Sequence, residues 1–247
     1  MKKIHFDTII STNAFLKNHY HELADFFLVS TTHQTEGRGR LGRIWNDDRN
    51  SALFSILIKQ EVPVNLIDRI PLIAVTSVHK VLSRLVPRIL IKWPNDIIMT
   101  EKKLAGILVE SVFAGDVLQS IVVGFGINVN NRTFSTELLQ KSTSLAIETD
   151  RFYDIDALID EIAKSFQTEF QAWRDGNDDF IKYCNRFSSL FGRTITFYHD
   201  NQEFKGKAGL MAIDGSLAVS TPEGNIYIHS GEVSLSDNRE LPLKPEK

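Results

Sequence analysis

The stretch RILIKWPNDIIMTEKKLAGILVES (residues 88–111) contains three short apolar runs separated by turn-forming residues. The runs at 88–92, 96–99 and 104–111 are typical of strands, and the polar tetrapeptide 100–103 lies between the last two. A fourth run, 119–125, follows Gly115-Asp116, a second hairpin signal. Because consecutive strands joined by tight turns pair antiparallel, this stretch argues against a doubly wound parallel sheet.

Helical periodicity appears on either side of this stretch. Apolar residues recur at helical spacing from Leu66 to Val86, which predicts a helix that Pro87 ends. Further helices are predicted over 155–173 and 178–187, and Ser11-Thr12-Asn13 precedes a short helical run as an N-cap. Strands are predicted at 26–30 and 51–59. The sequence therefore predicts an α+β fold with a mixed, largely antiparallel sheet.

The pattern changes after Phe191-Gly192, where short β-prone runs follow one another without a helix. They lie at 194–198, 203–211, 216–219 and 225–228, separated by Asp200-Asn201, Asp214-Gly215 and Glu223-Gly224. This predicts a small SH3-like barrel. We expect a catalytic domain over 1–188, a C-terminal domain over 189–247, and a frayed tail at 244–247.

Composition limits the classes of function. The chain has 247 residues and a net charge of −3, so no overall basic field attracts nucleic acid. Its single cysteine, Cys184, excludes an internal disulfide framework, and its apolar stretches are too short to span a bilayer. We expect a cytoplasmic protein that binds neither DNA nor membrane.

A glycine-punctuated run with three arginines, Gly37-Arg38-Gly39-Arg40-Leu41-Gly42-Arg43, suits phosphate or carboxylate ligands. It formally matches the dinucleotide fingerprint G-x-G-x-x-G, but residues 43–50 that follow cannot begin a packed helix. A solvated loop or an RNA-contacting loop are the alternative readings.

Lys92-Trp93-Pro94-Asn95-Asp96 is a stiffer element, because Pro94 restricts both itself and Trp93. Taken alone it fits a strand-end turn with an Asx cap. Lys103-Leu104-Ala105-Gly106 lies just across the next hairpin, so Lys103 and Asp96 are expected to meet. Asp96 is then a candidate Mg²⁺ ligand or nucleotide-orienting group. Gly124-x-Gly126-Ile127-Asn128 fits a bulge or turn equally well.

Five motifs in one order make the chain similar to the biotin–protein ligase family from about Ser11 onward. The chain has the following motifs: Ser11-Thr12-Asn13, Gln34-x-x-Gly37-Arg38-Gly39-Arg40, Lys92-Trp93-Pro94-Asn95-Asp96, Lys103-Leu104-Ala105-Gly106 and Gly124-x-Gly126-Ile127-Asn128. The ending Gly231-Glu232-Val233-Ser234-Leu235 also resembles the C-terminal barrel of that family. Ten residues precede Ser11, so we expect the type without an N-terminal DNA-binding domain. Glu36 and Leu41 depart from the family pattern, since a small residue and a basic residue are usual there.

The resemblance implies roles for individual residues. Biotin would contact Ser11, Thr12, Asn13, Gln34, Gly37, Arg38, Lys103 and Gly106. The nucleotide would contact Arg38, Arg40, Trp45, Lys92, Asn95, Asp96, Lys103 and Asn128, with Asp96 also the metal ligand. Lys103, Arg40 and Asp96 would carry catalysis, and Arg40 and Trp45 would belong to a loop that closes over the intermediate.

The implied reaction uses biotin, ATP and Mg²⁺ to form biotinyl-5′-AMP, and then biotinylates one lysine of a biotin carboxyl carrier protein domain. A lipoate or octanoate ligase or transferase is the alternative enzyme. A non-enzymatic nucleotide- or RNA-binding protein is the third hypothesis. The sequence leaves open whether the protein is a monomer or a homodimer.

Overall fold

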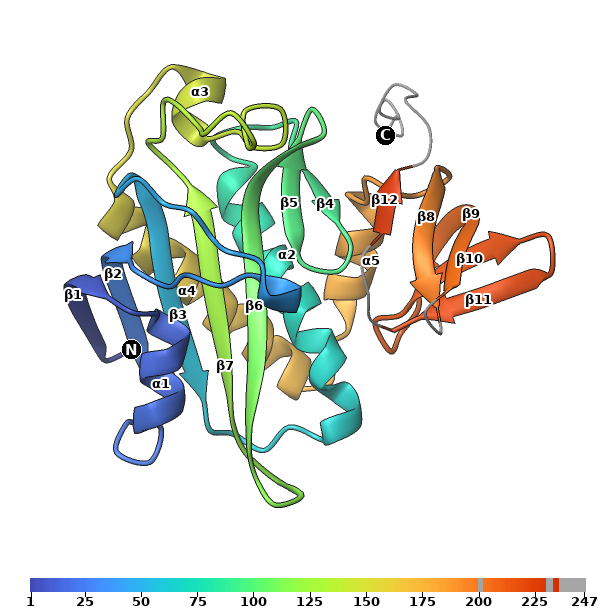
Figure 1. Ribbon diagram of the computed structural model, residues 1–247. Helices are drawn as coiled ribbons and strands as arrows, with labels where there is room; N and C mark the ends of the chain where they lie inside the picture. The colour runs from blue at the N-terminus through green and yellow to red at the C-terminus, as the bar shows by residue number, and fades with distance from the viewer. Residues whose placement is uncertain (200–201, 230–232, 236–247) are drawn as a thin grey trace.

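The computed structural model describes residues 1–199, 202–229 and 233–235, which form two sheets with helices around the larger one (Figure 1). The large sheet has seven strands in the order β1-β2-β3-β7-β6-β5-β4. They are β1 (Lys3–Ile9), β2 (Leu28–Gln34), β3 (Ser51–Ile58), β4 (Leu90–Lys92), β5 (Asp96–Met99), β6 (Lys102–Ala114) and β7 (Val117–Asn128). Only β1 and β2 run parallel, and the other neighbours are antiparallel. The predicted mixed, largely antiparallel sheet is confirmed.

Residues 88–111 form the β4–β5–β6 part of this sheet. The turn between β5 and β6 has positive φ at both central residues, 47° at Thr100 and 66° at Glu101, as a type I′ turn requires. The hairpin of β6 and β7 extends further than expected, because Phe113 and Val117 continue the pairing where the strands are exposed. The apolar pattern that marks buried strands stops before this end of the hairpin, so the sequence did not predict it.

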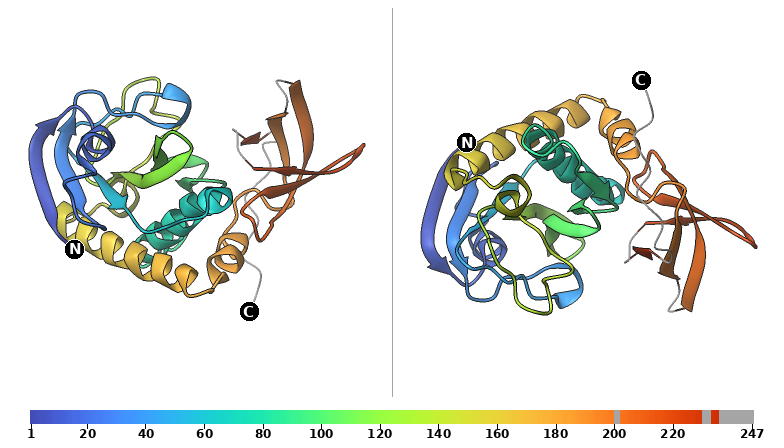
Figure 2. Two further views of the ribbon diagram at one scale, coloured as in Figure 1. Left: turned by 90° about the horizontal axis from the view of Figure 1, so that it is seen from below. Right: turned by 90° about the horizontal axis from the view of Figure 1, so that it is seen from above.

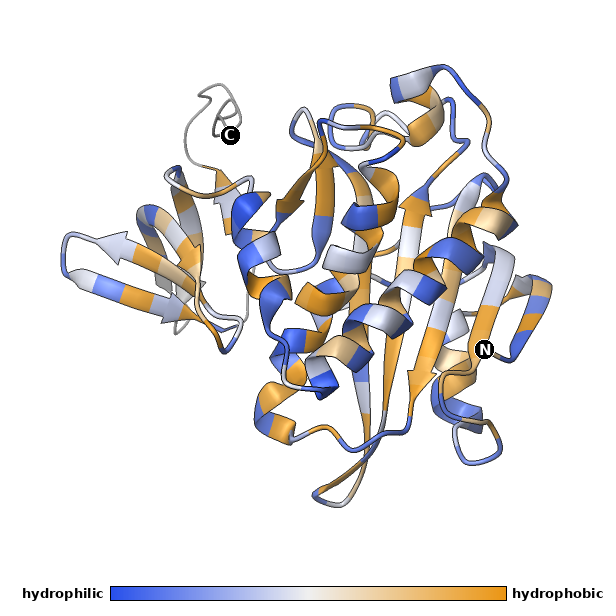
Figure 3. Cartoon of the chain, turned by 180° about the vertical axis from the view of Figure 1, so that it is seen from behind, coloured by the Kyte–Doolittle hydropathy of each residue, from blue (hydrophilic) through white to orange (hydrophobic). Residues whose placement is uncertain are grey.

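Helices cover both faces of the large sheet. Helices α2 (Ile70–Leu82) and α4 (Ile155–Arg174) lie on one face and α1 (Thr12–His19) on the other (Figure 2). Seen from behind, α4 crosses strands that are largely hydrophobic (Figure 3). Since both faces are covered, every residue of β3 is buried. The capping role predicted for Ser11 is confirmed, because its side chain accepts from the backbone N–H of Ala14 at the start of α1.

The helix expected over 66–86 is shorter than predicted. A 3₁₀ helix, η2 (Val64–Arg69), precedes α2, and α2 begins at Ile70 with Pro71 in its first turn, where the missing N–H costs nothing. The helix ends at Leu82, so Pro87 does not terminate it. A turn in which the N–H of Val86 bonds the carbonyl of Leu82 replaces the last predicted turn.

The other helices are α3 (Leu145–Thr149) and α5 (Asp179–Arg186). Helices predicted over 155–173 and 178–187 are confirmed as α4 and α5, whereas α3 and the edge strand β1 were not predicted. Cys184 of α5 is fully buried, and burial raises the pKa of its thiol to about 12. No helix within the described ranges is long and apolar enough to span a membrane.

The second sheet is antiparallel, in the order β11-β10-β9-β8-β12. Its strands are β8 (Thr194–His199), β9 (Gln202–Met211), β10 (Leu217–Thr221), β11 (Gly224–Ile228) and β12 (Val233–Leu235). It docks on α5 through a pair of bonds between the Asn185 side chain and the backbone of Met211, at 3.0 and 2.7 Å. The predicted turn at 200–201, residues 231–232 of the family-like ending and the tail 244–247 lie outside the described residues.

Candidate active site

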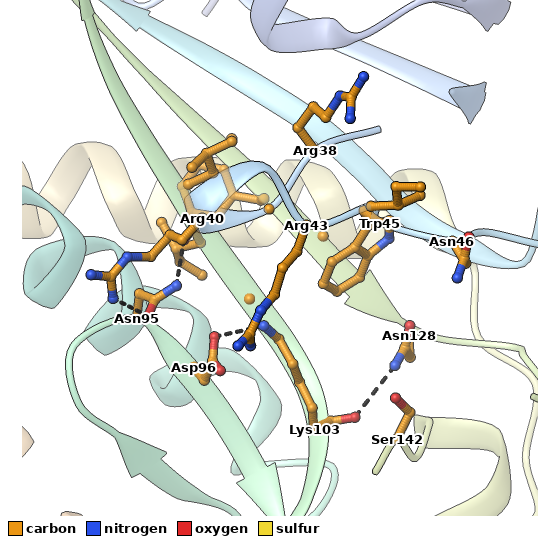
Figure 4. A pocket seen from close by; sticks show the side chains of 18 of the residues that line it. Arg38, Arg40, Arg43, Trp45, Asn46, Asn95, Asp96, Lys103, Asn128 and Ser142 are labelled. Atoms are coloured by element: carbon orange, nitrogen blue, oxygen red, sulfur yellow. Dashed lines mark hydrogen bonds and ion pairs between the residues drawn. The ribbon is translucent and has the colours of Figure 1, made fainter. Parts of the chain in front are cut away.

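A cavity of about 440 Å³ opens where the arginine loop faces strand β6 and the Lys92–Asp96 corner between β4 and β5 (Figure 4). The charged side chains among its described lining residues are Arg38, Arg40, Arg43, Lys92, Lys103, Lys141 and Asp96. Six cations against one carboxylate make this pocket strongly positive. An anionic ligand is the chemistry that such a lining favours.

Glycines of β6 and β7 form the floor of the cavity. Gly106 and Gly126 are paired across the two strands, and the indole of Trp45 lies over both. A Cβ on Gly126 would lie 2.7 Å from the ring of Trp45, and one on Gly106 would lie 2.6 Å from the Lys103 side chain. The bulge or turn reading of this motif is therefore replaced by close packing, since these are regular strand residues whose missing side chains admit Trp45.

Lys103 sits at the centre of the charged part. Its ammonium lies 2.8 Å from Asp96 Oδ1 and 5.5 Å from the ring centroid of Trp45. Its backbone is held on the other side, because its N–H donates to Lys141 and its carbonyl accepts from Thr143. The predicted meeting of Lys103 and Asp96 is present in the structure.

The Lys92–Asp96 corner is rigidly built. The Asn95 side chain donates to the carbonyl of Ile107 at 2.7 Å and accepts from Arg40 Nη1 at 3.1 Å. Trp93 is 2% exposed, and its indole N–H donates to the carbonyl of Gly215 in the loop before β10 at 2.9 Å. The peptide bond between Trp93 and Pro94 is cis. The corner is thereby tied to β6, to the arginine loop and to the C-terminal sheet.

The arginine loop folds back on itself. The N–H of Gly39 donates to the backbone carbonyl of Arg43 at 2.7 Å, and the N–H of Trp45 donates to the carbonyl of Gly37 at 2.9 Å. Behind it, the Asp47 side chain is fully buried and accepts from the backbone of Gln34 and, at 2.9 Å, pairs with His33. Asp47 therefore anchors the return of the loop to β2.

The other end of the cavity is polar and neutral. Thr12 donates its backbone N–H to Gln34 Oε1 at 2.8 Å, and its hydroxyl lies 2.6 Å from that of Ser55. Asn13 lies over Gly124, where a Cβ would be 2.4 Å from its Oδ1. The Ser11 hydroxyl is 3.4 Å from the N–H of Ala14 that it caps. This end offers neutral hydrogen-bonding groups rather than charge.

Of the predicted site residues, all except Gly37 line this one cavity. Gly37 stands just behind the lining, bonded to Trp45. Arg38 points away from Lys103 (Figure 4) and lies 3.7 Å from Glu36, the unusual carboxylate of the loop. Asn128 uses its amide to hold the carbonyl of Thr143 at 2.9 Å.

Several lining residues were missed from the sequence. They include Arg43, Asn46, Phe134, Leu138, Lys141, Ser142, Val233 and Ser234. Arg43 is the third arginine of the loop, so its positive charge could have predicted a place in the anion-binding site. Val233 and Ser234 belong to the family-like ending, which was not connected with the site. The others come from segments without a motif, and only their convergence in space brings them to the site.

The number of carboxylates in the cavity decides which kind of magnesium site it could form. The described residues contain no cluster of three or more His, Cys, Asp or Glu side chains that would hold a metal unaided. Mg²⁺ at nucleotide sites commonly takes one or two carboxylates plus phosphate oxygens. The single carboxylate Asp96 fits that mode and does not fit a site made by protein alone.

Comparison with known proteins agrees with this geometry. The family model of the biotin/lipoate A/B protein ligases matches residues 6–128. The bifunctional ligase/repressor BirA of Bacillus spizizenii is 30% identical over 225 residues, covering 87% of this chain and 69% of that protein. The biotin–[acetyl-CoA-carboxylase] ligase of Paracoccus denitrificans is 27% identical, covering 83% and 88%. The chain belongs to the biotin/lipoate A/B protein ligase family.

The solved structure of biotin protein ligase from Aquifex aeolicus in complex with biotin and ATP is similar along almost the whole chain. Its TM-score is 0.85 at 27% identity, covering 95% of this chain and 98% of that one. The resemblance to biotin–protein ligases is thus confirmed. The relatives and the structure named here are biotin ligases, so the lipoate alternative is not favoured.

Proposed function

We propose that this protein activates biotin with ATP as biotinyl-5′-AMP and transfers the biotinyl group to one lysine of a biotin carboxyl carrier protein domain. The observation that carries the proposal is the position of Lys103. It lies between the glycine floor and Asp96, in a cavity lined by six cations and one carboxylate.

In the first step the biotin carboxylate attacks the α-phosphorus of ATP, the bond to the β-phosphate oxygen breaks, and pyrophosphate leaves. Two anions have to meet, so the ammonium of Lys103 acts by stabilising negative charge in the transition state, and the guanidinium of Arg40 adds a much smaller share. Asp96 would hold a magnesium ion bound with the nucleotide, and that ion would supply further charge neutralisation.

In the second step the neutral ε-amine of the acceptor lysine attacks the acyl carbon. An amide bond forms, the bond between the acyl carbon and the phosphate oxygen breaks so that AMP leaves, and the proton lost by the amine finally passes to solvent. Asp96 would orient this amine or accept its proton, and the position of its carboxylate in the cavity lining beside Lys103 supports this role. The arginine loop and Trp45 shield the mixed anhydride from water between the two steps.

The two ends of the cavity divide the substrates. We assign the ureido end of biotin to Ser11, Thr12, Asn13, Gln34, Gly37 and Arg38, and its carboxylate end to Gly106 and Lys103. We assign the nucleotide to Arg38, Arg40, Trp45, Lys92, Asn95, Asp96, Lys103 and Asn128. The neutral polar end and the cationic end of the cavity support this division.

The proposal also includes a catalytic domain over 1–188, an SH3-like domain over 189–247 and a cytoplasmic location. The start of the second sheet at Thr194, after α5 ends at Arg186, supports the boundary. The single cysteine supports a reducing compartment.

The test is intact-mass spectrometry of a biotin carrier domain incubated with this protein, Mg·ATP and equal amounts of biotin and lipoate. One ATP-dependent biotin adduct per carrier is the expected result. A lipoyl adduct, or no adduct and no pyrophosphate, would contradict the proposal.

A further inference from the structure

A chain of hydrogen bonds runs from Glu110, on β6 outside the cavity lining, to the neutral polar end of the cavity. Glu110 Oε2 accepts from Asn13 Nδ2 at 2.7 Å, and its other oxygen pairs with Lys17 at 2.5 Å. Asn13 Oδ1 accepts from the Ser55 hydroxyl at 2.5 Å, and Ser55 Oγ lies 2.6 Å from Thr12 Oγ1. Asn13, Ser55 and Thr12 are buried, and Ser55 is fully so.

The direction of each bond follows from the first one. An ionised carboxylate only accepts, so Asn13 must turn its NH₂ toward Glu110 and its oxygen toward Ser55. The single hydroxyl proton of Ser55 is then used on Asn13. The remaining short contact requires Thr12 to donate to Ser55.

The same logic fixes the groups that face the cavity. Gln34 Oε1, at 3.1 Å, is a second acceptor within reach of Thr12 Oγ1, but the 2.6 Å contact with Ser55 takes the proton of Thr12, which therefore stays inside the protein. Toward a ligand Thr12 Oγ1 therefore acts only as an acceptor. Gln34 Oε1 also takes the backbone N–H of Thr12 at 2.8 Å, so Gln34 meets a ligand with its NH₂ group as a donor.

We propose that Glu110 is a positioning residue that fixes the hydrogen-bond polarity of the pocket end that receives the ureido ring of biotin. This inference rests on the proposed function. A cyclic urea presents an N–H donor next to a carbonyl acceptor, which matches the acceptor Thr12 and the donor Gln34. The dithiolane ring of lipoate has neither group and would leave both protein groups unpaired, which is a strong source of discrimination.

Replacing the carboxylate with an amide removes the fixed polarity. In Glu110→Gln, both neighbours of the new side chain are donors, Lys17 and Asn13, and only one can meet its oxygen. When the oxygen of the new amide accepts from Lys17, Asn13 turns over and Ser55 donates to Thr12. Thr12 then has a proton of its own that can turn toward the ligand, so its role as an acceptor is no longer fixed. Biotin binding then weakens while the groups around Lys103 are unchanged.

The experiment measures pyrophosphate release by the full chain with biotin and with two cyclic carbamate analogues, in each of which one ring N–H is replaced by oxygen. For Glu110→Gln we expect the KM for biotin to rise about tenfold, with kcat and the KM for ATP within about twofold. We expect the preference for biotin over the analogue whose oxygen faces Thr12 to fall by a similar factor. A preference equal to that of the wild-type protein would overturn the proposal.

Three further variants separate polarity from mere structure. Ser55→Ala cuts the chain with almost no loss of volume and is expected to lower the same preference, which keeps the test decisive if Glu110→Gln does not fold. Lys17→Met removes the ion pair but leaves the acceptor for Asn13, so the preference is expected to stay. Glu169→Gln removes a carboxylate that pairs with Lys80 at 2.5 Å, away from the cavity, and is the matched control for activity.

The outcomes also distinguish the two proposals. If the wild-type protein releases no pyrophosphate with biotin, the proposed function fails and this inference fails with it. If the wild-type protein is active and Lys17→Met lowers the preference as much as Glu110→Gln does, only the polarity argument fails.

Discussion

The arginine loop and the Lys92–Asp96 corner face each other across one cavity, but the chain holds them in different ways. Leu41 and Ile44 of the loop are 77% and 69% exposed, whereas Trp93 and Asn95 of the corner are 2% and 8% exposed. The corner is bonded to β6 and to the C-terminal sheet, whereas the backbone N–H groups of Gly39, Arg43 and Trp45 donate to carbonyls within the loop itself. A two-step reaction with a reactive intermediate needs one rigid wall that positions charge, here the corner, and one exposed wall that covers the ligand, here the loop.

This comparison is tested most strongly at the rigid wall. Lys103→Ala is expected to lower the rate of pyrophosphate release by about 10²- to 10³-fold, because the repulsion between carboxylate and phosphate loses its nearest cation. Lys102→Ala, one residue earlier on the same strand and outside the cavity lining, is the matched control. Equal rates for the two variants would show that the corner does not place the charge that matters.

The rigid wall is also expected to weaken in acid. His79 of α2 bonds the carbonyl of Ile89 just before β4, and burial lowers its pKa from 6.5 to about 4. Between these values the unfolded chain binds a proton that the folded chain does not, so stability is lost as the pH falls from about 6.5 to about 4. The loss attributable to His79 is up to about 3 kcal/mol. Urea unfolding of the wild-type protein and His79→Gln at pH 7.5, 5.5 and 4.5 measures it, and identical pH slopes would contradict the assignment.

A smaller effect is expected where the corner meets the C-terminal sheet. Trp93→Phe removes the donor to the carbonyl of Gly215 and leaves that oxygen unpaired, at a cost of about 1–3 kcal/mol in the free energy of unfolding. It should also slow adenylate formation several-fold, since the corner loses a fixed point. Trp173→Phe, in α4, removes the same atoms away from the corner. A comparable loss of activity in that control would assign the effect to general destabilisation.

The loop is expected to give the smallest change in the first step. Arg40→Gly removes the bond to Asn95 and should leave the initial rate of adenylate formation within about threefold while the intermediate escapes. Labelling of bystander lysines, measured by mass spectrometry, should rise about tenfold. This corresponds to a loss of roughly 1.4 kcal/mol in the binding free energy of the adenylate. Arg49→Gly is the control, because Arg49 is exposed beyond the loop and its φ of 66° suits glycine. Normal carrier biotinylation without bystander labelling would remove this role from Arg40.

The same contrast explains what sequence could predict. The corner and the strand starting near Lys103 were predicted because tight turns and a proline fix local geometry, and a hairpin brings Lys103 to Asp96. The start of α2 was misplaced because apolar spacing continues through Leu66 and Ile67, which form a 3₁₀ helix instead. The spacing of apolar residues does not distinguish a short 3₁₀ helix from the first turns of an α-helix.

The missed site residues share a different cause. Ser55 is an ordinary serine in a buried strand, and Lys141 belongs to a segment without a motif. Their partners are distant in the chain: Asn13 is 42 positions from Ser55, and Lys103, whose N–H donates to the carbonyl of Lys141, is 38 positions from Lys141. Such partnerships have no period or spacing in the sequence, so they require the folded structure.

The position of β12 has a consequence for how the protein is made. Val233 and Ser234 complete one edge of the cavity, and β12 is held there by pairing with β8. On the ribosome, residues 1–199 emerge before this strand does, so the nascent chain presents the cationic corner with that edge still open. Synthesis of the chain therefore delays completion of the cavity until residue 234 has left the exit tunnel, and a half-made enzyme is poorly suited to keep a reactive mixed anhydride.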